Sequence, residues 1–453
     1  MNTSQERRGR INPQAAAELP GNAQPVAIDR VQDALDQAQA GETIWVASGT
    51  YADRQFVWTY KGEGPVAIRA REDGGVRLTG ASLVTIRGSW HVVLSGFWFD
   101  AVTSDNSVVL DGSSDVHVTE NYFYRNGRTP TSKIVGIRNG SARNEIHHNT
   151  FDQSYGQSVA TYNGHTPDDV NNTDNRIYAN LFYDIPTVKS VYNKTNGMEA
   201  VQLGQGRDVH VVHRTQVYEN VFEHVAGDLD EIISVKTSGN AIYRNSFLNS
   251  PSGLTIRLGA GNTIRDNYFE NAEKGIRSYG YDQTIARNYL AGGRIGIQFP
   301  AADTKTGEKE QVAAPYYQSD RSLITDNIIV RPSEAAFVFG RNYKSDQWPL
   351  LPTALRIENN DVYLSSVRAK DFTMHEQALA FDPSMATFKG NRTFGIDRLN
   401  RGSVTAGDPA AIAFTITAEP VFPSPSDFWG EEPLGSRDSR TGTAWKRPEP
   451  VIR

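Results

Sequence analysis

A short phrase that recurs along the chain constrains its fold more than any other feature of the sequence. The phrase consists of a β-branched residue, two further residues, an asparagine, one residue and an apolar residue. Full copies read VTENYF, IHHNTF, IYANLF, VYENVF, IYRNSF and IRDNYF, and weaker copies are centred on Asn288, Asn327 and Asn360. Asn220, Asn245, Asn267 and Asn288 follow one another at intervals of 25, 22 and 21 residues.

A regular interval just above twenty residues, with one short strand in each unit, is typical of a solenoid. The repeated strands are rich in Val, Ile, Tyr and Phe, which favours stacked strands over stacked helices. The sequence therefore predicts an all-β protein, a single-stranded right-handed parallel β-helix. Stacked turns of such a coil can bring the repeated asparagines into a hydrogen-bonded ladder at one corner.

The length of 453 residues would by itself suggest two or three domains, but a solenoid extends along one axis without dividing its core. We expect a loose segment over residues 1–25, a coil domain over 26–366 and an irregular tail packed on the coil over 367–453. Apolar residues at helical spacing from Ile28 to Ala38 predict a helix that caps the open end of the coil. Residues 301–318 interrupt the repeat and are interpreted as an insertion.

Composition excludes several classes of protein. The net charge of −6 gives no sign of a nucleic-acid-binding surface, and no stretch is long and apolar enough to span a bilayer. The absence of cysteine excludes disulfides and thiolate metal sites. The opening MNTSQERRGR lacks an apolar segment behind its charges, so no signal peptide is visible in this numbering. We expect a monomer with neither a nucleic-acid nor a membrane partner.

The strand upstream of each phrase carries one polar residue that we expect to face outward. Lys236 and Arg257 are 21 residues apart, and Arg257 and Arg277 are 20 apart, each about one turn. Because consecutive turns lie ~4.8 Å apart, the outward polar residues of seven successive strands predict a single column about 29 Å long. Its members would be Arg138, Tyr162, Gln202, Lys236, Arg257, Arg277 and Gln298. Stacked cations repel one another unless an anion lies against them, although a solvated basic face is the simpler alternative.

Acidic residues stand close to this column in the sequence. Asp228, Asp230 and Glu231 precede Lys236, and Asn196 and Glu199 lie further upstream. Carboxylates and an asparagine carbonyl are the oxygen ligands that calcium requires. The alternative is that these loop acids pair with the neighbouring lysine and arginine side chains.

The segments EIISVKTSGNAIYRNSF and GLTIRLGAGNTIRDNYF resemble polysaccharide lyase family 6, which contains alginate lyases and chondroitinase B. NGMEAVQLG is similar to that family's NGxExIRxG segment, and AGETIWVASGTYAD resembles its opening strand. The resemblance covers roughly residues 25 to 365. It implies an enzyme that acts on an anionic polysaccharide outside the cytoplasm, in the periplasm or after secretion.

The resemblance also implies roles for individual residues. Lys236 would be the catalytic base and Arg257 its partner on the acid side of the reaction. Arg277 matches a substrate-binding arginine, and we place Gln202, Arg138 and Tyr162 with it as substrate-binding positions.

For a metal, the resemblance implies calcium. Asn196 and Glu231 match two of the family's usual calcium ligands, and Asp230 and Glu199 are the further candidates. Leu229 stands where the family has another calcium-binding glutamate, which leaves the calcium requirement open. Two other departures are Gln202, in place of an arginine, and Leu258, in place of a histidine.

The implied reaction is β-elimination in a 4-linked uronic acid polymer, with alginate as the first choice. A base removes the proton at C5, beside the carboxylate, and the oxygen at C4 departs. A cation near the carboxylate makes that proton more acidic. The alternatives are a dermatan- or glucuronan-type lyase, a C5-epimerase, a glycoside hydrolase with two carboxylates, and a polysaccharide-binding solenoid without catalysis.

Overall fold

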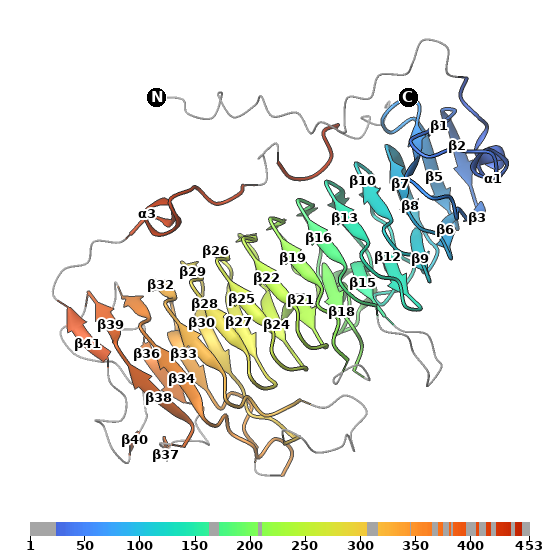
Figure 1. Ribbon diagram of the computed structural model, residues 1–453. Helices are drawn as coiled ribbons and strands as arrows, with labels where there is room; N and C mark the ends of the chain where they lie inside the picture. The colour runs from blue at the N-terminus through green and yellow to red at the C-terminus, as the bar shows by residue number, and fades with distance from the viewer. Residues whose placement is uncertain are drawn as a thin grey trace. The chain divides into compact units, whose positions relative to one another are not determined.

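Strands make up nearly all the regular structure of the protein (Figure 1). The computed structural model describes residues 24–162, 172–206, 211–305, 316–344, 346–364, 370–374, 380–381, 384–395, 405–406, 414–417, 423–435 and 440–445. Nearly all of the predicted loose N-terminal segment, and much of the predicted tail, lie outside the described residues. The chain divides into two units. Unit 1 consists of Met1–Val201, Thr215–Asp228 and Leu434–Arg453, and unit 2 of Gln202–Arg214 and Leu229–Pro433.

In unit 1 the described strands form three parallel sheets, and the chain visits them in rotation. The first contains β1 (Thr43–Val46), β4 (Val66–Ala70), β7 (Val92–Ser95), β10 (His117–Thr119), β13 (Glu145–His147), β16 (Arg176–Tyr178) and β19 (Gln216–Tyr218). The second contains β2 (Gly49–Ala52), β5 (Val76–Gly80), β8 (Phe97–Val102), β11 (Tyr122–Tyr124), β14 (Thr150–Asp152), β17 (Leu181–Tyr183) and β20 (Val221–Glu223). The third contains β3 (Gln55–Trp58), β6 (Leu83–Arg87), β9 (Val108–Asp111), β12 (Lys133–Arg138) and β15 (Gln157–Thr161).

Unit 2 repeats this arrangement. Its first sheet contains β22 (Ala241–Tyr243), β25 (Thr263–Arg265), β28 (Thr284–Ala286), β31 (Leu323–Thr325), β34 (Leu355–Glu358) and β38 (Ala386–Lys389). The second contains β23 (Ser246–Leu248), β26 (Tyr268–Glu270), β29 (Tyr289–Ala291), β32 (Ile328–Val330), β35 (Asp361–Tyr363), β39 (Asn391–Phe394) and β41 (Phe414–Thr417). The third contains β21 (Glu231–Val235), β24 (Gly253–Ile256), β27 (Lys274–Ser278), β30 (Ile295–Phe299), β33 (Ala335–Phe339) and β36 (Lys370–Met374).

Three parallel sheets visited in rotation are the right-handed parallel β-helix that the repeat predicts, and the predicted fold class is confirmed. Two short strands, β37 (Ala380–Phe381) and β40 (Thr405–Ala406), pair with each other. The strand β18 (Val201–Leu203) falls at the division between the units in the sequence. Pairing with the coil continues past residue 366, the predicted end of the coil, because β38 pairs with β34 and β39 with β35.

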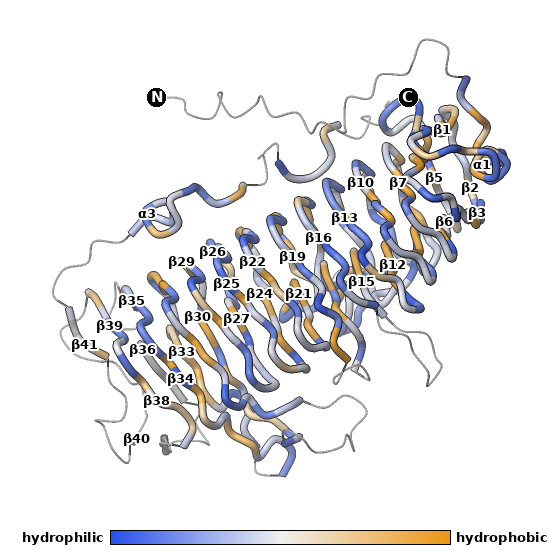
Figure 2. Tube along the Cα trace, viewed as in Figure 1, coloured by the Kyte–Doolittle hydropathy of each residue, from blue (hydrophilic) through white to orange (hydrophobic). Residues whose placement is uncertain are grey.

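The repeated phrase explains both the core and the corners. Its first and last residues point inward, as Val118 and Phe123 do, and both are at most 1% exposed. In unit 1 the ring of Phe123 stacks on that of Phe151 with centroids 4.8 Å apart, which matches the spacing of adjacent strands. Figure 2 shows the apolar residues gathered along the strands.

The asparagine ladder is confirmed in both units. The side-chain oxygen of Asn149 accepts a hydrogen bond from the backbone N–H of Asn121 at 3.0 Å, and that of Asn180 accepts one from Asn149 in the same way. The residue before each ladder asparagine adopts a positive φ, for example 54° at Glu120 and 56° at Asp266. The chain therefore turns from the first sheet to the second at this point, and the asparagine satisfies the backbone groups of the corner.

The N-terminal cap is shorter than the pattern predicts. A 3₁₀ turn, η2 (Ile28–Arg30), leads into α1 (Val31–Leu35), and the helix ends before Ala38. Val31 and Leu35 are buried, so this element covers the apolar end of the coil in unit 1. The other helices of the described residues are α2 (Val188–Tyr192) and α3 (Pro425–Trp429). Within the described residues, none of the helices has the length and apolar character that a membrane span requires.

Candidate active site

Lys236 and Arg257 lie side by side at one end of the third sheet of unit 2. Each directly follows its strand, β21 and β24, and these strands pair with Val235 opposite Ile256. The backbone N–H of Arg257 donates to the carbonyl of Val235 at 2.8 Å. The interval between Lys236 and Arg257 is therefore one turn of the coil, as the sequence predicts.

Lys236 is buried, with only 8% of its surface exposed. Its Nζ donates to Oε1 of Gln202 at 2.8 Å. An amide oxygen is an uncharged acceptor, so this hydrogen bond orients the amine without adding a negative charge beside it. Gln202 therefore contacts the candidate base directly and orients its amine.

Arg257 is half-buried against aromatic side chains that sequence reasoning missed. Its guanidinium carbon lies 4.7 Å from the ring centroid of Tyr316. The Tyr316 ring in turn lies 5.0 Å from that of Tyr279 and 5.8 Å from that of Trp348. Such stacking holds the flat guanidinium in one orientation. Tyr279 could have been found from its position one turn after Arg257, whereas no repeat pointed to Tyr316.

The predicted single column is wrong, because Arg277 does not lie beside Arg257. The register of β24 and β27 pairs Arg277 with Thr255 and Ser278 with Ile256, so the neighbour of Arg257 on the next turn is Tyr279. Arg277 therefore falls two positions short of the place that the single column requires. On its other side, Arg277 is paired with Gln298 of β30. The polar residues thus form two adjacent rows on the same face, one with Lys236 and Arg257 and the other with Arg277 and Gln298.

Arg277 is engaged by carboxylates and is not an open cation. Its Nη2 lies 2.7 Å from Oε1 of Glu231, its Nη1 lies 3.4 Å from Oδ2 of Asp230, and its Nε donates to Oγ1 of Thr255 at 3.1 Å. Burial alone would lower the pKa of Arg277, but Glu231 and Asp230 raise it above its ordinary value. The Arg277 and Glu231 side chains are only 13% and 4% exposed.

Asp230 forms a second ion pair, with Lys274. Burial would raise the pKa of Asp230, but Arg277 and Lys274 hold it below its ordinary value. In unit 2, the acids before Lys236 therefore pair with neighbouring cations, as the simpler sequence interpretation proposed. Their role as calcium ligands stays a prediction.

The remaining predicted metal ligands lie in unit 1. Glu199 is 1% exposed, and one of its oxygens accepts a hydrogen bond from Nε2 of Gln157 at 2.8 Å. A carboxylate oxygen of Glu199 lies within 4.8 Å of one from Asp228. Asn196 is exposed, in the loop after α2. Glu199 and Asp228 thus offer oxygen donors at a distance that one cation can span.

Arg138 and Tyr162 also lie in unit 1, on its third sheet. The register of β12 and β15 pairs Ile137 with Thr161 and so brings the two following residues together. Nη2 of Arg138 lies 3.0 Å from Oδ2 of Asp111. Burial raises the pKa of Tyr162 above its ordinary value, so its hydroxyl stays protonated at neutral pH. Substrate binding by these residues remains a prediction.

Comparison with known proteins adds independent findings. The model of the family described as chondroitinase B matches residues 26–379. The alginate lyase AlyGC of family PL6 superposes with a TM-score of 0.75 and 22% identity, over 94% of this chain and 59% of AlyGC. This chain thus spans little more than half of AlyGC. No curated protein matches the sequence.

Two further solved structures are covered more completely. A PL6 polysaccharide lyase from Pseudopedobacter saltans gives a TM-score of 0.70 at 19% identity, over 94% of this chain and 100% of the other. A mannuronic-acid-specific family 6 lyase from human gut microbiota gives 0.70 at 20% identity, over 88% and 91% of the two chains. At these identities the likeness establishes a shared fold.

Proposed function

We propose that this chain, which belongs to the chondroitinase B family, polysaccharide lyase family 6, cleaves a 4-linked uronic acid polymer by β-elimination, with alginate as its substrate. The observation that carries the proposal is the pairing of the buried Lys236 with Arg257 on adjacent strands of one sheet. Alginate is favoured because several structures of similar fold are named alginate lyases, one of them in complex with a trisaccharide.

In this proposal Lys236 removes the proton at C5 of the uronic acid. The C5–H electron pair forms the C4–C5 double bond, the C4–O bond breaks, and the departing oxygen takes a proton from solvent. Arg257 hydrogen-bonds that oxygen as its negative charge develops, and it is held in place for this by Tyr316. Gln202 keeps the amine of Lys236 in one position before the substrate binds.

Calcium is the metal that the family implies, and the oxygen donors of unit 1 fit it. Glu199 and Asp228 would hold the ion, because their carboxylate oxygens approach within 4.8 Å. When bound, calcium would neutralise the carboxylate of the sugar and make the C5 proton more acidic. Asn196, Asp230 and Glu231 remain predicted ligands.

The test is a panel of uronate polymers, scored by the ultraviolet absorbance of the unsaturated product. Polymannuronate, polyguluronate, glucuronan and dermatan sulfate separate the candidate substrates. We expect absorbance to rise with the alginate polymers. An altered C5 configuration without chain cleavage would instead identify an epimerase, and binding without any reaction would identify a non-catalytic solenoid.

Variants then test the assigned roles. We expect Lys236→Ala to lower turnover by a factor on the order of 10²–10⁴, the usual contribution of general base catalysis. Lys236→Arg should fail as well, because guanidinium does not act as a base at neutral pH. Arg257→Ala should reduce turnover strongly. The matched controls are the exposed Lys389→Ala and Arg356→Ala in the same unit. Full activity of Lys236→Ala would refute the assignment.

A further inference from the structure

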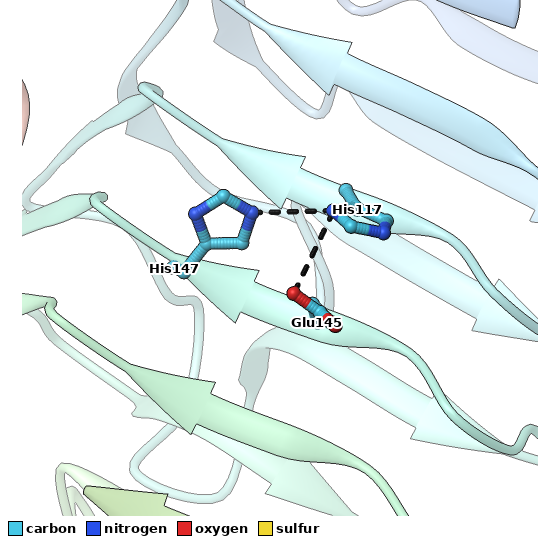
Figure 3. Close-up of side chains that lie close together, drawn as sticks. All are labelled: His117, Glu145 and His147. Carbon is cyan, nitrogen blue, oxygen red and sulfur yellow. Dashed lines mark hydrogen bonds and ion pairs between the residues drawn. The ribbon is translucent and has the colours of Figure 1, made fainter. Parts of the chain in front are cut away.

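A cluster of histidine and carboxylate side chains lies on the first sheet of unit 1, away from the third sheet. His117 is on β10, and Glu145 and His147 are on the adjacent strand β13 (Figure 3). The register of the two strands pairs His117 with Glu145 and Thr119 with His147. Side chains alternate along a strand, and Ile146 faces the core with 0% exposure. Glu145 and His147 therefore lie on the outer face with His117.

The three side chains bring potential metal ligands together. Nδ1 of His117 lies 3.3 Å from Nε2 of His147 and 3.7 Å from Oε2 of Glu145. The three ligand atoms all lie within 4.8 Å of one another. Ligands bound at about 2.0–2.1 Å around a tetrahedral zinc ion are separated by roughly 3.3 Å. The separations of 3.3 and 3.7 Å from Nδ1 of His117 are close to that value.

Neighbouring groups orient these ligands as the supporting shell of a metal site does. Oγ1 of Thr119 lies 3.1 Å from Nδ1 of His147. The same Nδ1 lies 2.8 Å from Nδ1 of His148. In the tautomer of His147 that carries Nδ1–H, which faces these two partners, Nε2 keeps its lone pair directed at the cluster. The hydroxyl of Tyr178 donates to Oε2 of Glu145 at 2.7 Å, and its ring stacks on His147 with centroids 4.7 Å apart.

The cluster is also accessible from one side. His147 is buried with 3% of its surface exposed, whereas the side chains of His117 and Glu145 are 31% and 15% exposed. An ion could enter from solvent, and a water molecule could complete its coordination. Two imidazole nitrogens with one carboxylate suit zinc and similar transition metals, whereas calcium prefers oxygen ligands throughout.

We propose that His117, Glu145 and His147 form a binding site for a divalent transition metal ion of the zinc type. The ion would join the adjacent turns that carry β10 and β13. It acts as a structural link and takes no part in the reaction of the third sheet. The inference is independent of the proposed lyase function.

The experiment measures metal binding directly on untagged, full-length protein that has been stripped with a chelator and dialysed. Zinc is titrated by calorimetry, and its affinity is confirmed by competition with a chromophoric chelator. We expect one tight zinc ion per chain, a higher melting temperature with zinc, and a tetrahedral cobalt(II) spectrum that zinc abolishes. Calcium should not abolish the cobalt(II) spectrum, because the cluster lacks the all-oxygen ligand set that calcium prefers.

Variants locate the ion. His117→Gln and His147→Gln should each weaken zinc binding at least tenfold, and Thr119→Val, which removes the orienting hydroxyl, should weaken it less. His224→Gln is the matched control, because His224 faces a single carboxylate, with Nδ1 3.0 Å from Oδ1 of Asp184. Circular dichroism verifies folding, and the partly exposed His117 supplies the variant that should fold normally.

Two results would overturn the proposal. One is the absence of zinc binding to the wild-type protein at micromolar concentrations. The other is unchanged zinc affinity in both folded histidine variants, which would place the ion elsewhere. Because no readout depends on polysaccharide cleavage, failure of the lyase assay would leave this test unaffected.

Discussion

The asparagine ladder makes a quantitative prediction about stability. The side chain of Asn267 is fully buried, and its Oδ1 accepts hydrogen bonds from the backbone N–H and the Nδ2 of Asn245 at 3.1 and 3.0 Å. Its Nδ2 donates to Ile242 O, Arg265 O and Asn288 Oδ1 at 3.0–3.1 Å. Asn267→Ala removes all of these interactions.

Asn262, one corner away in the same unit, provides a matched control. It is equally buried, and its Oδ1 also accepts two hydrogen bonds, both from Asn240 at 2.9 Å. Among the residues that the structure describes, its Nδ2 has no partner. Both substitutions to alanine remove the same side-chain atoms, so the losses of packing are similar. The two variants therefore differ in the hydrogen bonds that the Nδ2 group makes in the wild-type protein.

The difference can be estimated from these contacts. The two N–H groups of Asn267 Nδ2 contribute about 1 kcal/mol each, and Asn262→Ala additionally relieves a buried donor that costs about 1–3 kcal/mol. We therefore expect Asn267→Ala to lower the free energy of unfolding by about 3–5 kcal/mol more than Asn262→Ala. Urea denaturation followed by circular dichroism measures both variants. Equal losses, or a larger loss for Asn262→Ala, would refute the reasoning.

Three further predictions concern charged groups. Arg277→Met should lower the free energy of unfolding by about 3–5 kcal/mol, because it removes a cation that pairs with the buried Glu231, and the urea midpoint of this variant should recover when Glu231→Gln is added. Burial would raise the pKa of Asp111, but hydrogen bonds from Arg138 and Asn139 lower it below its ordinary 3.8. Its contribution to stability is thus present above pH 3.8 and lost as pH falls through the folded-state pKa; thermal midpoints should fall less in acid for Asp111→Asn than for wild type, and an identical fall would contradict this. Because Leu229 stands where the family resemblance places a calcium-binding glutamate, we expect activity lost to a chelator to return only at calcium concentrations above the micromolar range, and restoration at sub-micromolar calcium would contradict a weakened site.

The candidate active site was predictable where the repeat is regular. Lys236 and Arg257 could be paired from their interval in the sequence, because the register of Val235 with Ile256 has the same interval of 21 residues. The same reasoning from intervals placed Arg277 beside Arg257, which is wrong. The turn that follows Arg257 is two residues longer than the interval between Arg257 and Arg277, so Arg277 lies beside Thr255 instead. Turn length varies with the corner loops, and a single added or missing residue changes the face on which a side chain lies.

Contacts that depend on loops were beyond the reach of the sequence. Tyr316 stacks on Arg257 from the end of an insertion that matches no repeat, and the ion pair of Arg277 with Glu231 joins strands two turns apart. The zinc-type cluster was also missed, because His117 and His147 are distant in the sequence and become neighbours only through the register of β10 and β13.

The sequence by itself determined the β-helix and its asparagine ladder, because the asparagine recurs in every copy of the phrase and only stacked turns satisfy all copies together. Only the tertiary structure decided which polar side chains meet on the outer faces. Those contacts depend on the strand register and on loops of unequal length, which the periodic pattern of the core leaves unconstrained.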